Sequence, residues 1–177
     1  IREILDIVQK DRVDLLVPTV DLDLKTLAEH HGQLQALGCR VLVSSPAVID
    51  ICQDKRKTHR FLTEHGYPSP ATMTLAEALR KEDHVFPLFL KPWDGSASRG
   101  NAIAKDREEL LFYGRRIPNC VVQEYIVGEE YTCDVFVDFQ MQVRCVVPRK
   151  RIQVRSGEVS KGQVVKDERV MRRTAEV

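Results

Sequence analysis

The sequence has almost no excess charge of either sign, little glycine or proline, and no long apolar run. Its 177 residues carry 27 Lys and Arg against 26 Asp and Glu, a formal net charge of +1, so bulk charge does not predict capture by nucleic acid or by an anionic membrane. No apolar stretch approaches the roughly 18–20 residues of a membrane helix. With only nine Gly and eight Pro, the composition excludes collagen-like and disordered classes and predicts a globular protein of one or two domains.

The sequence also lacks a leader segment and a natural start. A signal peptide needs a charged segment followed by an apolar one, and neither pattern is present. The first residue is Ile1 rather than Met. We therefore expect the chain to begin inside a longer polypeptide.

Closely paired cysteines, which zinc and redox sites require, are missing as well. The five cysteines are Cys39, Cys52, Cys120, Cys133 and Cys145. Most of them lie among Val, Ile and Leu, which favours reduced core or strand residues of a cytoplasmic protein. His30 and His31 are adjacent in a helical pattern and do not share a face, so a shared metal ion is not expected.

The first part of the chain has an α/β pattern. Residues 1–10 and 24–37 repeat apolar side chains at helical spacing, and Gly38 supplies a helix stop. Residues 14–20 and 39–44 are apolar runs that predict buried strands. A strand, a helix and a strand in about 30 residues form a βαβ unit, which predicts parallel pairing.

A domain boundary is predicted after this α/β part. Residues after Pro46 predict a short apolar turn, followed by a charged helix over 54–65. Gly66 and the proline-bracketed segment 67–70 then interrupt the pattern. We expect a partial α/β domain at 1–48, a linking helix at 49–70, a small subdomain at 71–122 and an incomplete larger one at 123–177.

The remaining pattern predicts an α+β fold with largely antiparallel strands. Thr74 and Glu77 form a capping box at the start of a helix that runs to about residue 81, and Asp106 caps another over 107–115. The predicted strands cover residues 86–91, 101–105, 120–125, 131–138 and 142–149.

The most informative segment is a lysine at the end of a buried strand, followed by a loop of small residues. Lys91 precedes the loop 94–100, and this combination suits a polyanion. Gly95 and Gly100 have the spacing of a P-loop, but Asn101-Ala102 replace the Lys-Ser/Thr that a P-loop needs. Taken alone, the segment is equally consistent with an ordinary hairpin loop and a solvated lysine.

Further motifs follow in a fixed order. Asp54-Lys55 comes first, then Lys91 with its loop, then Gln123-Glu-Tyr-Ile-Val-Gly-Glu-Glu-Tyr131, then Asp134. In this order the sequence resembles the ATP-grasp superfamily, and within it the ATP-grasp unit of the carbamoyl phosphate synthase large subunit and related carboxylate–amine ligases. The resemblance implies an ATP-grasp fold in which 71–122 is the small lid subdomain, 123–177 lacks the C-terminal part of the core, and 1–48 is a partial pre-ATP-grasp domain.

The resemblance implies phosphate contacts for two lysines and the small-residue loop. Lys55 and Lys91 look like the lysines that reach the α- and β-phosphates of ATP, a role that suits a mobile point charge. The loop that folds over the β- and γ-phosphates corresponds to Gly95, Ser96, Ser98 and Gly100. For Lys55 a solvated helix charge stays open, and Arg99 reaches either phosphate or water.

It also implies an adenine hinge and a ribose contact. The hinge corresponds to Gln123, Glu124, Tyr125 and Ile126. The Glu124 carbonyl and the Ile126 N–H would read N6 and N1 of adenine, and the Gln123 or Glu124 side chain would add to the N6 contact. Glu130 looks like the carboxylate that accepts from both ribose hydroxyls, with a solvated turn glutamate as the alternative. By strand alternation Asp134 shares its face.

A basic segment follows the hinge. Residues 148–155 lead into a glycine-containing loop at 156–162, and in relatives such a strand lies near the γ-phosphate. Arg149 or Arg151 is therefore the candidate catalytic group that neutralises the transferred phosphoryl group, against the alternative of a solvated basic face. No metal ligand is assigned within the chain: Mg²⁺ ligands are expected beyond Val177, after a charged helix that begins near residue 166.

The implied function is that of an ATP-dependent ligase forming carbon–nitrogen bonds through an acylphosphate. Its expected partners are ATP, Mg²⁺, and a small-molecule carboxylate and amine, with no nucleic acid and no membrane; a homo-oligomer stays open. The alternative is a non-catalytic nucleotide-binding or regulatory module of the same fold. A dinucleotide-binding βαβ protein is disfavoured because no G-x-G-x-x-G follows either N-terminal strand.

Overall fold

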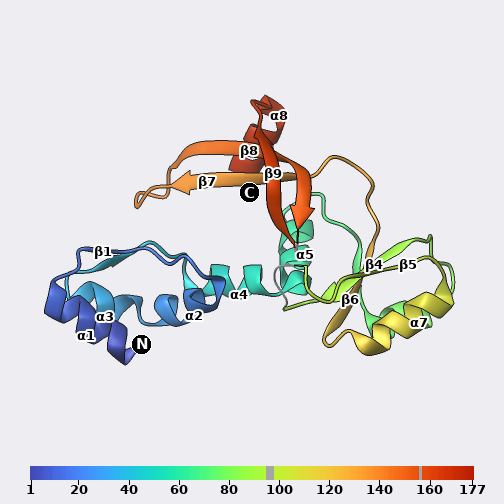
Figure 1. Cartoon of the computed structure of the whole chain (residues 1–177), viewed down its shortest axis with the longest axis horizontal. Helices are drawn as coiled ribbons and strands as arrows, with labels where there is room; N and C mark the ends of the chain where they lie inside the picture. The colour runs from blue at the N-terminus through green and yellow to red at the C-terminus, as the bar shows by residue number, and fades with distance from the viewer. Residues whose placement is uncertain (95–97, 156) are drawn as a thin grey trace. The chain divides into compact units, whose positions relative to one another are not determined.

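A computed structural model describes residues 1–94, 98–155 and 157–177 (Figure 1). The chain divides into two compact units, Ile1–Phe61 and Leu62–Val177. The finer boundaries expected at 48, 70 and 122 stay a prediction. Within the described residues, no helix has both the length and the apolar character needed to span a membrane.

The first unit is a small α/β arrangement. Its elements are α1 (Arg2–Asp11), β1 (Leu15–Leu16), α2 (Asp21–Glu29), α3 (His31–Ala36), β2 (Arg40–Val41), α4 (Pro46–Gln53) and the start of α5 (Lys55–Glu64). Strands β1 and β2 pair in parallel, which confirms the predicted βαβ unit. Its core gathers Val8, Leu27, Leu34, Cys39 and Val41.

Two predictions for this unit are wrong. Residues 24–37 do not form one helix, because the chain leaves helical geometry at His30, whose φ is −106° and ψ is 12°. The segment after Pro46 is helix α4 rather than a turn. Ser45 is its N-cap, since its hydroxyl accepts from the Val48 N–H at 3.4 Å, and Pro46 occupies the first turn, where its missing N–H costs nothing.

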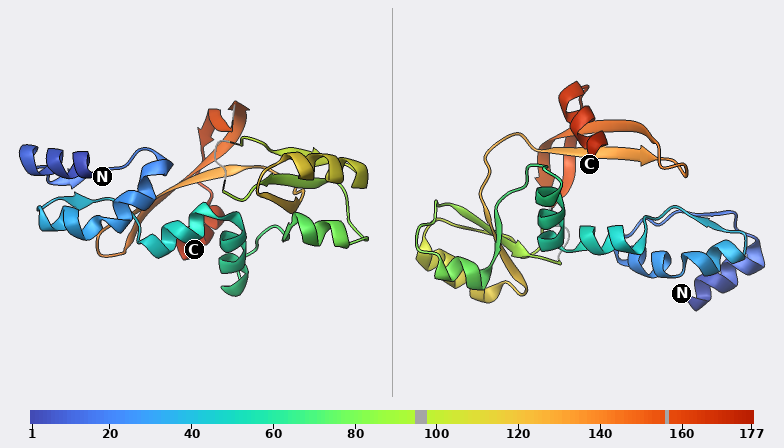
Figure 2. Two further views of the ribbon diagram at one scale, coloured as in Figure 1. Left: turned by 90° about the horizontal axis from the view of Figure 1, so that it is seen from below. Right: turned by 180° about the vertical axis from the view of Figure 1, so that it is seen from behind.

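The second unit begins with a four-stranded antiparallel sheet in the order β3-β6-β4-β5. These strands are β3 (Thr72–Thr74), β4 (Leu88–Pro92), β5 (Ala102–Ala104) and β6 (Cys120–Glu124). Helices α6 (Leu75–Arg80) and α7 (Arg107–Arg116) cover one face, and Figures 1 and 2 show α7 along the sheet. The core between them contains Ala78, Leu88, Leu90, Ala104, Leu110 and Val122.

Local rules account for the helices of this sheet. The predicted capping box at Thr74 and Glu77 is confirmed, and so is the Asp106 cap of α7. Because Gly114 has no side chain, α7 can pack close to Leu75 of α6. A Cβ at Gly114 would lie only 2.4 Å from Leu75 Cδ1. The predicted antiparallel α+β character of this part is likewise confirmed.

The rest of the second unit is a three-stranded antiparallel sheet, β7-β8-β9, with helix α8 (Glu168–Glu176) packed against it (Figure 1). Its strands are β7 (Tyr131–Val137), β8 (Val143–Arg155) and β9 (Glu158–Val164). The expected glycine-containing loop at 156–162 is wrong over most of its length, because β8 continues to Arg155 and the chain returns as β9. The predicted charged helix at the end of the chain is α8.

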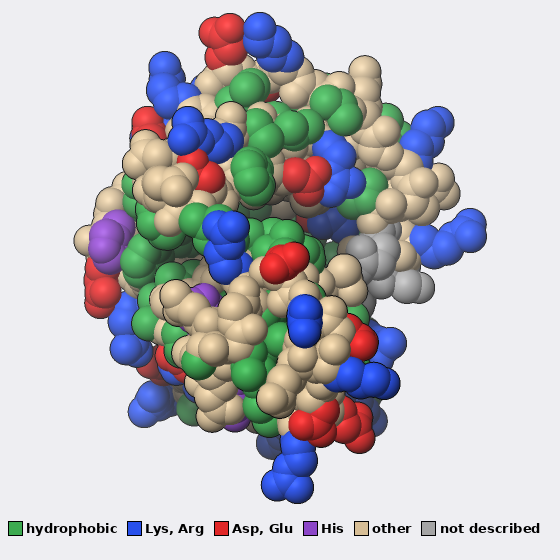
Figure 3. Space-filling view, turned by 90° about the vertical axis from the view of Figure 1, so that its left-hand side faces the viewer, with side chains coloured by type: hydrophobic (Ala, Val, Ile, Leu, Met, Phe, Trp, Pro, Cys, Tyr) green, Lys and Arg blue, Asp and Glu red, His purple; other side chains and the backbone are tan. Residues whose placement is uncertain are grey.

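Charged side chains of both signs lie on the face drawn in Figure 3. On the face shown in Figure 3, Lys and Arg side chains are interspersed with Asp and Glu, and hydrophobic side chains are exposed between them. The pattern agrees with the net charge of +1.

Candidate functional site

The face of the first sheet away from α6 and α7 carries one row of side chains that differ in kind from the core. Thr72 of β3 lies opposite Gln123 of β6, which in turn lies opposite Phe89 of β4. Lys91 is two residues after Phe89, so it shares that face. Leu88 and Leu90 alternate with them and enter the core on the other face. Strand β4 therefore contributes side chains to the core on one face and to this row on the other.

A cavity of about 580 Å³ lies over this row. The volume falls within the roughly 300–1,000 Å³ of small-molecule sites. Its lining residues are Pro70, Phe89, Lys91, Gln123, Glu124, Tyr125, Ile126, Val127, Gly128, Glu129 and Glu130. Every hinge residue expected from the sequence lines it, together with Lys91 and Glu130.

Two aromatic side chains, Phe89 and Tyr125, line the cavity together with Lys91. The rings of Phe89 and Tyr125 have centroids 6.5 Å apart at an interplanar angle of 45°. The Lys91 Nζ lies 5.5 Å from the Phe89 centroid, close enough for a cation–π attraction. Sequence analysis missed Phe89, although its position two residues before Lys91 already placed both on one face of a strand.

Charged pairs continue from the cavity along β7 and β8. Glu130 Oε1 lies 2.8 Å from Arg151 Nη1, and Asp134 Oδ2 lies 2.7 Å from Arg149 Nε. Thr132 lies opposite Arg149 between these pairs, so all these side chains share one face of the sheet. Glu130 and Asp134 therefore lie on the same face, as strand alternation predicts from the sequence.

The opposite face of β7 and β8 carries a separate polar cluster. Glu129 accepts from Lys150 and, at 2.9 Å, from the Tyr131 hydroxyl. The Lys150 ammonium lowers the pKa of Glu129, and the Glu129 carboxylate raises the pKa of Tyr131. Helix α8 packs against β7 and β8, and Val146 and Pro148, which share this face of β8 with Lys150, are buried, so this is the face that α8 covers.

The two candidate catalytic arginines do not line the cavity. Arg151 is more enclosed than Arg149, with side chains exposed by 17% and 37%. Its guanidinium also donates to the Gly157 carbonyl at 3.0 Å, and its buried Nε has no hydrogen-bond partner among the described residues. Arg151 therefore links the cavity wall at Glu130 to the turn between β8 and β9.

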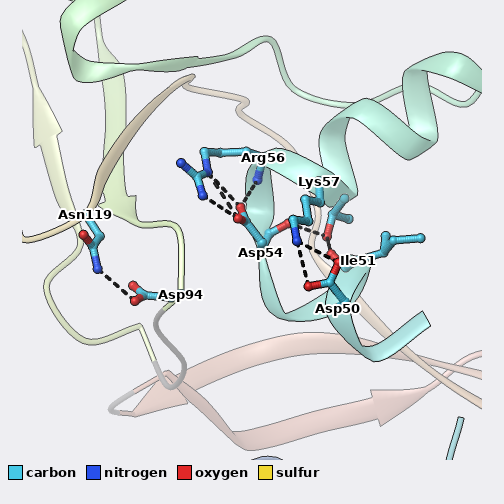
Figure 4. A network of polar contacts seen from close by, with 8 residues as sticks. Asp50, Ile51, Asp54, Arg56, Lys57, Asp94 and Asn119 are labelled. Atoms are coloured by element: carbon cyan, nitrogen blue, oxygen red, sulfur yellow. Dashed lines mark hydrogen bonds and ion pairs between the residues drawn. The ribbon is translucent and has the colours of Figure 1, made fainter. Parts of the chain in front are cut away.

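The phosphate-loop residues are placed in part. Gly95 and Ser96 lie outside the described residues. Ser98 and Gly100 both have left-handed backbone conformations, with φ of 53° and 74°. At the start of the loop, the Asn119 amide donates to Asp94 at 2.9 Å, as Figure 4 shows, and the Trp93 N–H donates to the Asn119 carbonyl at 2.9 Å.

Lys55 belongs to the other unit, where it begins α5. Asp54 precedes it and accepts from the Arg56 guanidinium, with the shortest distance 2.6 Å, as Figure 4 also shows. These hydrogen bonds lower the pKa of Asp54. The helix start at Lys55 is thus fixed by Asp54 and Arg56, and the phosphate role of Lys55 stays a prediction.

A metal-binding cluster is not found among residues 1–94, 98–155 and 157–177: no three His, Cys, Asp or Glu side chains there are arranged to hold an ion. The five cysteines are all free thiols. Cys39 and Cys120 are buried, whereas Cys52 and Cys145 are exposed.

Comparison with known proteins identifies the family. The family model of the ATP-grasp domain matches residues 52–177. The chain belongs to the ATP-grasp domain family. The resemblance and the ATP-grasp fold expected from the motif order are therefore confirmed.

Relatives of this ATP-grasp chain include ligases of two kinds. A D-alanine–D-alanine ligase of Bacillus anthracis is 30% identical over 159 residues, which cover 80% of this chain and 52% of that protein. A carbamoyl-phosphate synthase of Methanobrevibacter smithii is 26% identical over 128 residues, covering 70% and 35%. The chain thus spans about half the length of the curated relatives it matches first.

Solved structures share the fold. Biotin carboxylase of Campylobacter jejuni has a TM-score of 0.75 at 14% identity, covering 99% of this chain and 44% of that one. The biotin carboxylase domain of the Hydrogenobacter thermophilus 2-oxoglutarate carboxylase, solved with MgADP and bicarbonate, has a TM-score of 0.74 at 17% identity, covering 89% and 38%. At such identities these likenesses establish the fold alone.

Proposed function

We propose that the cavity over Gln123 and Lys91 binds ATP and that the protein carrying this ATP-grasp chain is a ligase. The observation that carries the proposal is the cavity lining: an extended segment at the end of β6, a lysine on β4 and a carboxylate before β7 converge on one space. An adenine edge needs one acceptor and one donor, which the Glu124 carbonyl and the Ile126 N–H would supply. Lys91 would meet phosphate and Glu130 the ribose.

The reaction proposed is the joining of a carboxylate to an amine. A carboxylate oxygen attacks the γ-phosphorus, and the bond from that phosphorus to ADP breaks. The amine then attacks the acyl carbon of the acylphosphate, the bond to phosphate breaks, and the nitrogen gives up a proton to solvent. Phosphoryl transfer depends mainly on positioning and on neutralising charge, and Arg149 and Arg151 would provide positive charge on the open face of β7 and β8. The ligase and carbamoyl-phosphate synthase relatives support this class of reaction.

Bound Mg²⁺ would neutralise phosphate charge in this reaction, as is general for phosphoryl transfer. The described residues do not form a site for it. Its ligands therefore stay a prediction for residues beyond Val177. A cytoplasmic location and a homo-oligomer likewise stay predictions from the sequence.

ATP binding is tested by calorimetry on the wild-type protein, Lys91→Ala and Arg80→Ala. Losing a charged hydrogen bond to phosphate is worth about 1.5–3 kcal/mol, so Lys91→Ala should weaken ATP binding roughly 10- to 100-fold. Arg80 is exposed at the end of α6 and outside the cavity lining, so its variant should bind ATP normally. Equal affinities for the two variants would remove Lys91 from the site.

The acylphosphate is tested with ¹⁸O-labelled carboxylates and the full-length protein. D-alanine, an L-amino acid and bicarbonate form the first panel, because relatives and structural neighbours act on or contain them. Transfer of ¹⁸O from the active carboxylate to inorganic phosphate is expected. Product formation with no ¹⁸O in the released phosphate would contradict an acylphosphate intermediate.

A further inference from the structure

A short chain of hydrogen bonds fixes the orientation of one amide in the cavity wall. The Thr72 hydroxyl donates to the Pro70 carbonyl at 2.8 Å, and the Gln123 Nε2 donates to Thr72 Oγ1 at 2.6 Å. A carbonyl oxygen only accepts, so the single hydroxyl proton of Thr72 is used on Pro70. Thr72 therefore presents a lone pair to Gln123, and the amide atom that meets it has to be the nitrogen.

The oxygen end of the same amide is left for the cavity. Gln123 is only 7% exposed and lines the cavity beside Pro70 and Phe89. In the part of the chain that the structure describes, no hydrogen bond reaches Gln123 Oε1. One N–H of the buried amide is engaged by Thr72, and the amide oxygen is left as an acceptor without a partner among the described residues.

An acceptor at this place distinguishes two kinds of purine. Adenine carries an amino donor at C6, whereas guanine and hypoxanthine carry a carbonyl acceptor there. Gln123 Oε1 would accept from the first and repel the second. A glutamine alone would not settle the choice, because its terminal torsion is broad and nearly twofold, so a half-turn exchanges oxygen for nitrogen.

We propose that Thr72 is a positioning residue that makes this site select 6-aminopurine over 6-oxopurine nucleotides, by holding the Gln123 amide with its oxygen toward the base. The proposal rests on the proposed function, since it needs a nucleotide in the cavity. Thr72 touches no base itself and acts through Gln123. The register that places the two residues opposite each other across β3 and β6 makes this possible.

The test compares ATP with inosine triphosphate (ITP) by calorimetry in Thr72→Val and Thr72→Ser. Valine keeps the shape and removes the hydroxyl, so the amide is free to turn and the ratio of ATP to ITP affinity should fall about tenfold. Serine keeps the hydroxyl and should keep the wild-type ratio. Thr72→Ala removes the hydroxyl as well and should behave as valine does.

A second experiment, in the Gln123→Glu variant, tests whether Thr72 acts by orienting the Gln123 amide or whether its loss simply disturbs the site. An ionised glutamate carboxylate has two acceptor oxygens and no donor, so in Gln123→Glu there is no amide left for Thr72 to orient. Adding Thr72→Val there should leave the ATP to ITP ratio unchanged. A tenfold fall in this background too would overturn the positioning role.

The outcomes distinguish the two proposals. A wild-type protein that binds no ATP overturns the proposed function. A wild-type protein that prefers ATP, with the same preference in Thr72→Val and Thr72→Ala, overturns the inference alone.

Discussion

Neighbouring glutamates before β7 take different partners because successive side chains point to opposite faces of a strand. Glu129 is held by Lys150 and Tyr131 on the face that α8 covers. Glu130 is held by Arg151 through Oε1 alone and is 64% exposed. Its Oε2 accepts no hydrogen bond within the described residues, so this oxygen is available to a ligand.

Replacing Glu130 by Gln should reduce discrimination between ATP and 2′,3′-dideoxy-ATP. The wild-type carboxylate would accept from the ribose hydroxyls through charge-assisted hydrogen bonds, each worth about 1.5–3 kcal/mol. In the variant the remaining oxygen faces the Arg151 guanidinium, so the preference for ATP should fall about tenfold. Competition titrations with the two nucleotides measure it.

Asp134→Asn is the matched control for this experiment. Asp134 pairs with Arg149 as Glu130 pairs with Arg151, on the same strand and face, but it does not line the cavity. Its variant should keep the preference for ATP. Unchanged discrimination in Glu130→Gln would exclude Glu130 from the ribose site.

At the scale of elements, β6 is the centre of the first sheet and connects the core to the cavity. Val121 and Val122 are fully buried, and Gln123 begins the run of residues that line the cavity. Cys120 starts the strand in the core, where burial raises the pKa of its thiol from 9.0 to about 11. We therefore expect β6 to be sensitive to alkaline pH at its first residue.

The stability of the second unit should fall between pH 9 and pH 11 because of Cys120. The unfolded thiol loses its proton near pH 9, whereas the folded thiol keeps it to about pH 11. The contribution is fully present below pH 9 and is lost as pH rises through the folded pKa. Two pKa units correspond to on the order of 2 kcal/mol.

Urea unfolding across this pH range checks the expectation. Cys120→Ala should show a shallower loss of unfolding free energy than the wild-type protein, whatever its stability at pH 8. The exposed Cys145→Ala is the control and should follow the wild-type slope. Parallel slopes for all three proteins would contradict a buried thiol at the start of β6.

Elements with a clear local signal were predictable, whereas an element whose local signal indicates a loop was not. The capping box at Thr74 and the cap at Asp106 were found because each is complete within four residues. The return strand β9 was missed because it forms by pairing with β8, and Gly157 suggested a loop.

The same distinction holds for the cavity. One contiguous motif predicted that residues 123–126 and Glu130 belong to a common site, and residues 123–130 run along the cavity wall. The hydrogen bond between Thr72 and Gln123 joins residues 51 apart and arises only from the β3–β6 register. Arg149 and Arg151 were recognisable as a basic segment, but their ion pairs were not, because the carboxylate partners Asp134 and Glu130 come from β7 and the residue before it.

At the scale of the whole molecule, each of the two units has a hydrophobic core among its described residues. One lies among Val8, Leu34 and Val41 in Ile1–Phe61, and the other among Leu88, Leu90 and Leu110 in Leu62–Val177. Every residue that lines the cavity belongs to the second unit. A ligand that binds only one unit stabilises that unit directly by mass action, by about 2.7 kcal/mol at 100 times its dissociation constant.

Calorimetric unfolding with and without ATP should therefore separate the two units. We expect two transitions, with the one for the second unit raised by several degrees in saturating ATP. Leu34→Ala, which opens a cavity in the first core, should lower the other transition and so assign it. An ATP-induced rise confined to the transition that Leu34→Ala lowers would contradict a nucleotide site over Gln123 and Lys91.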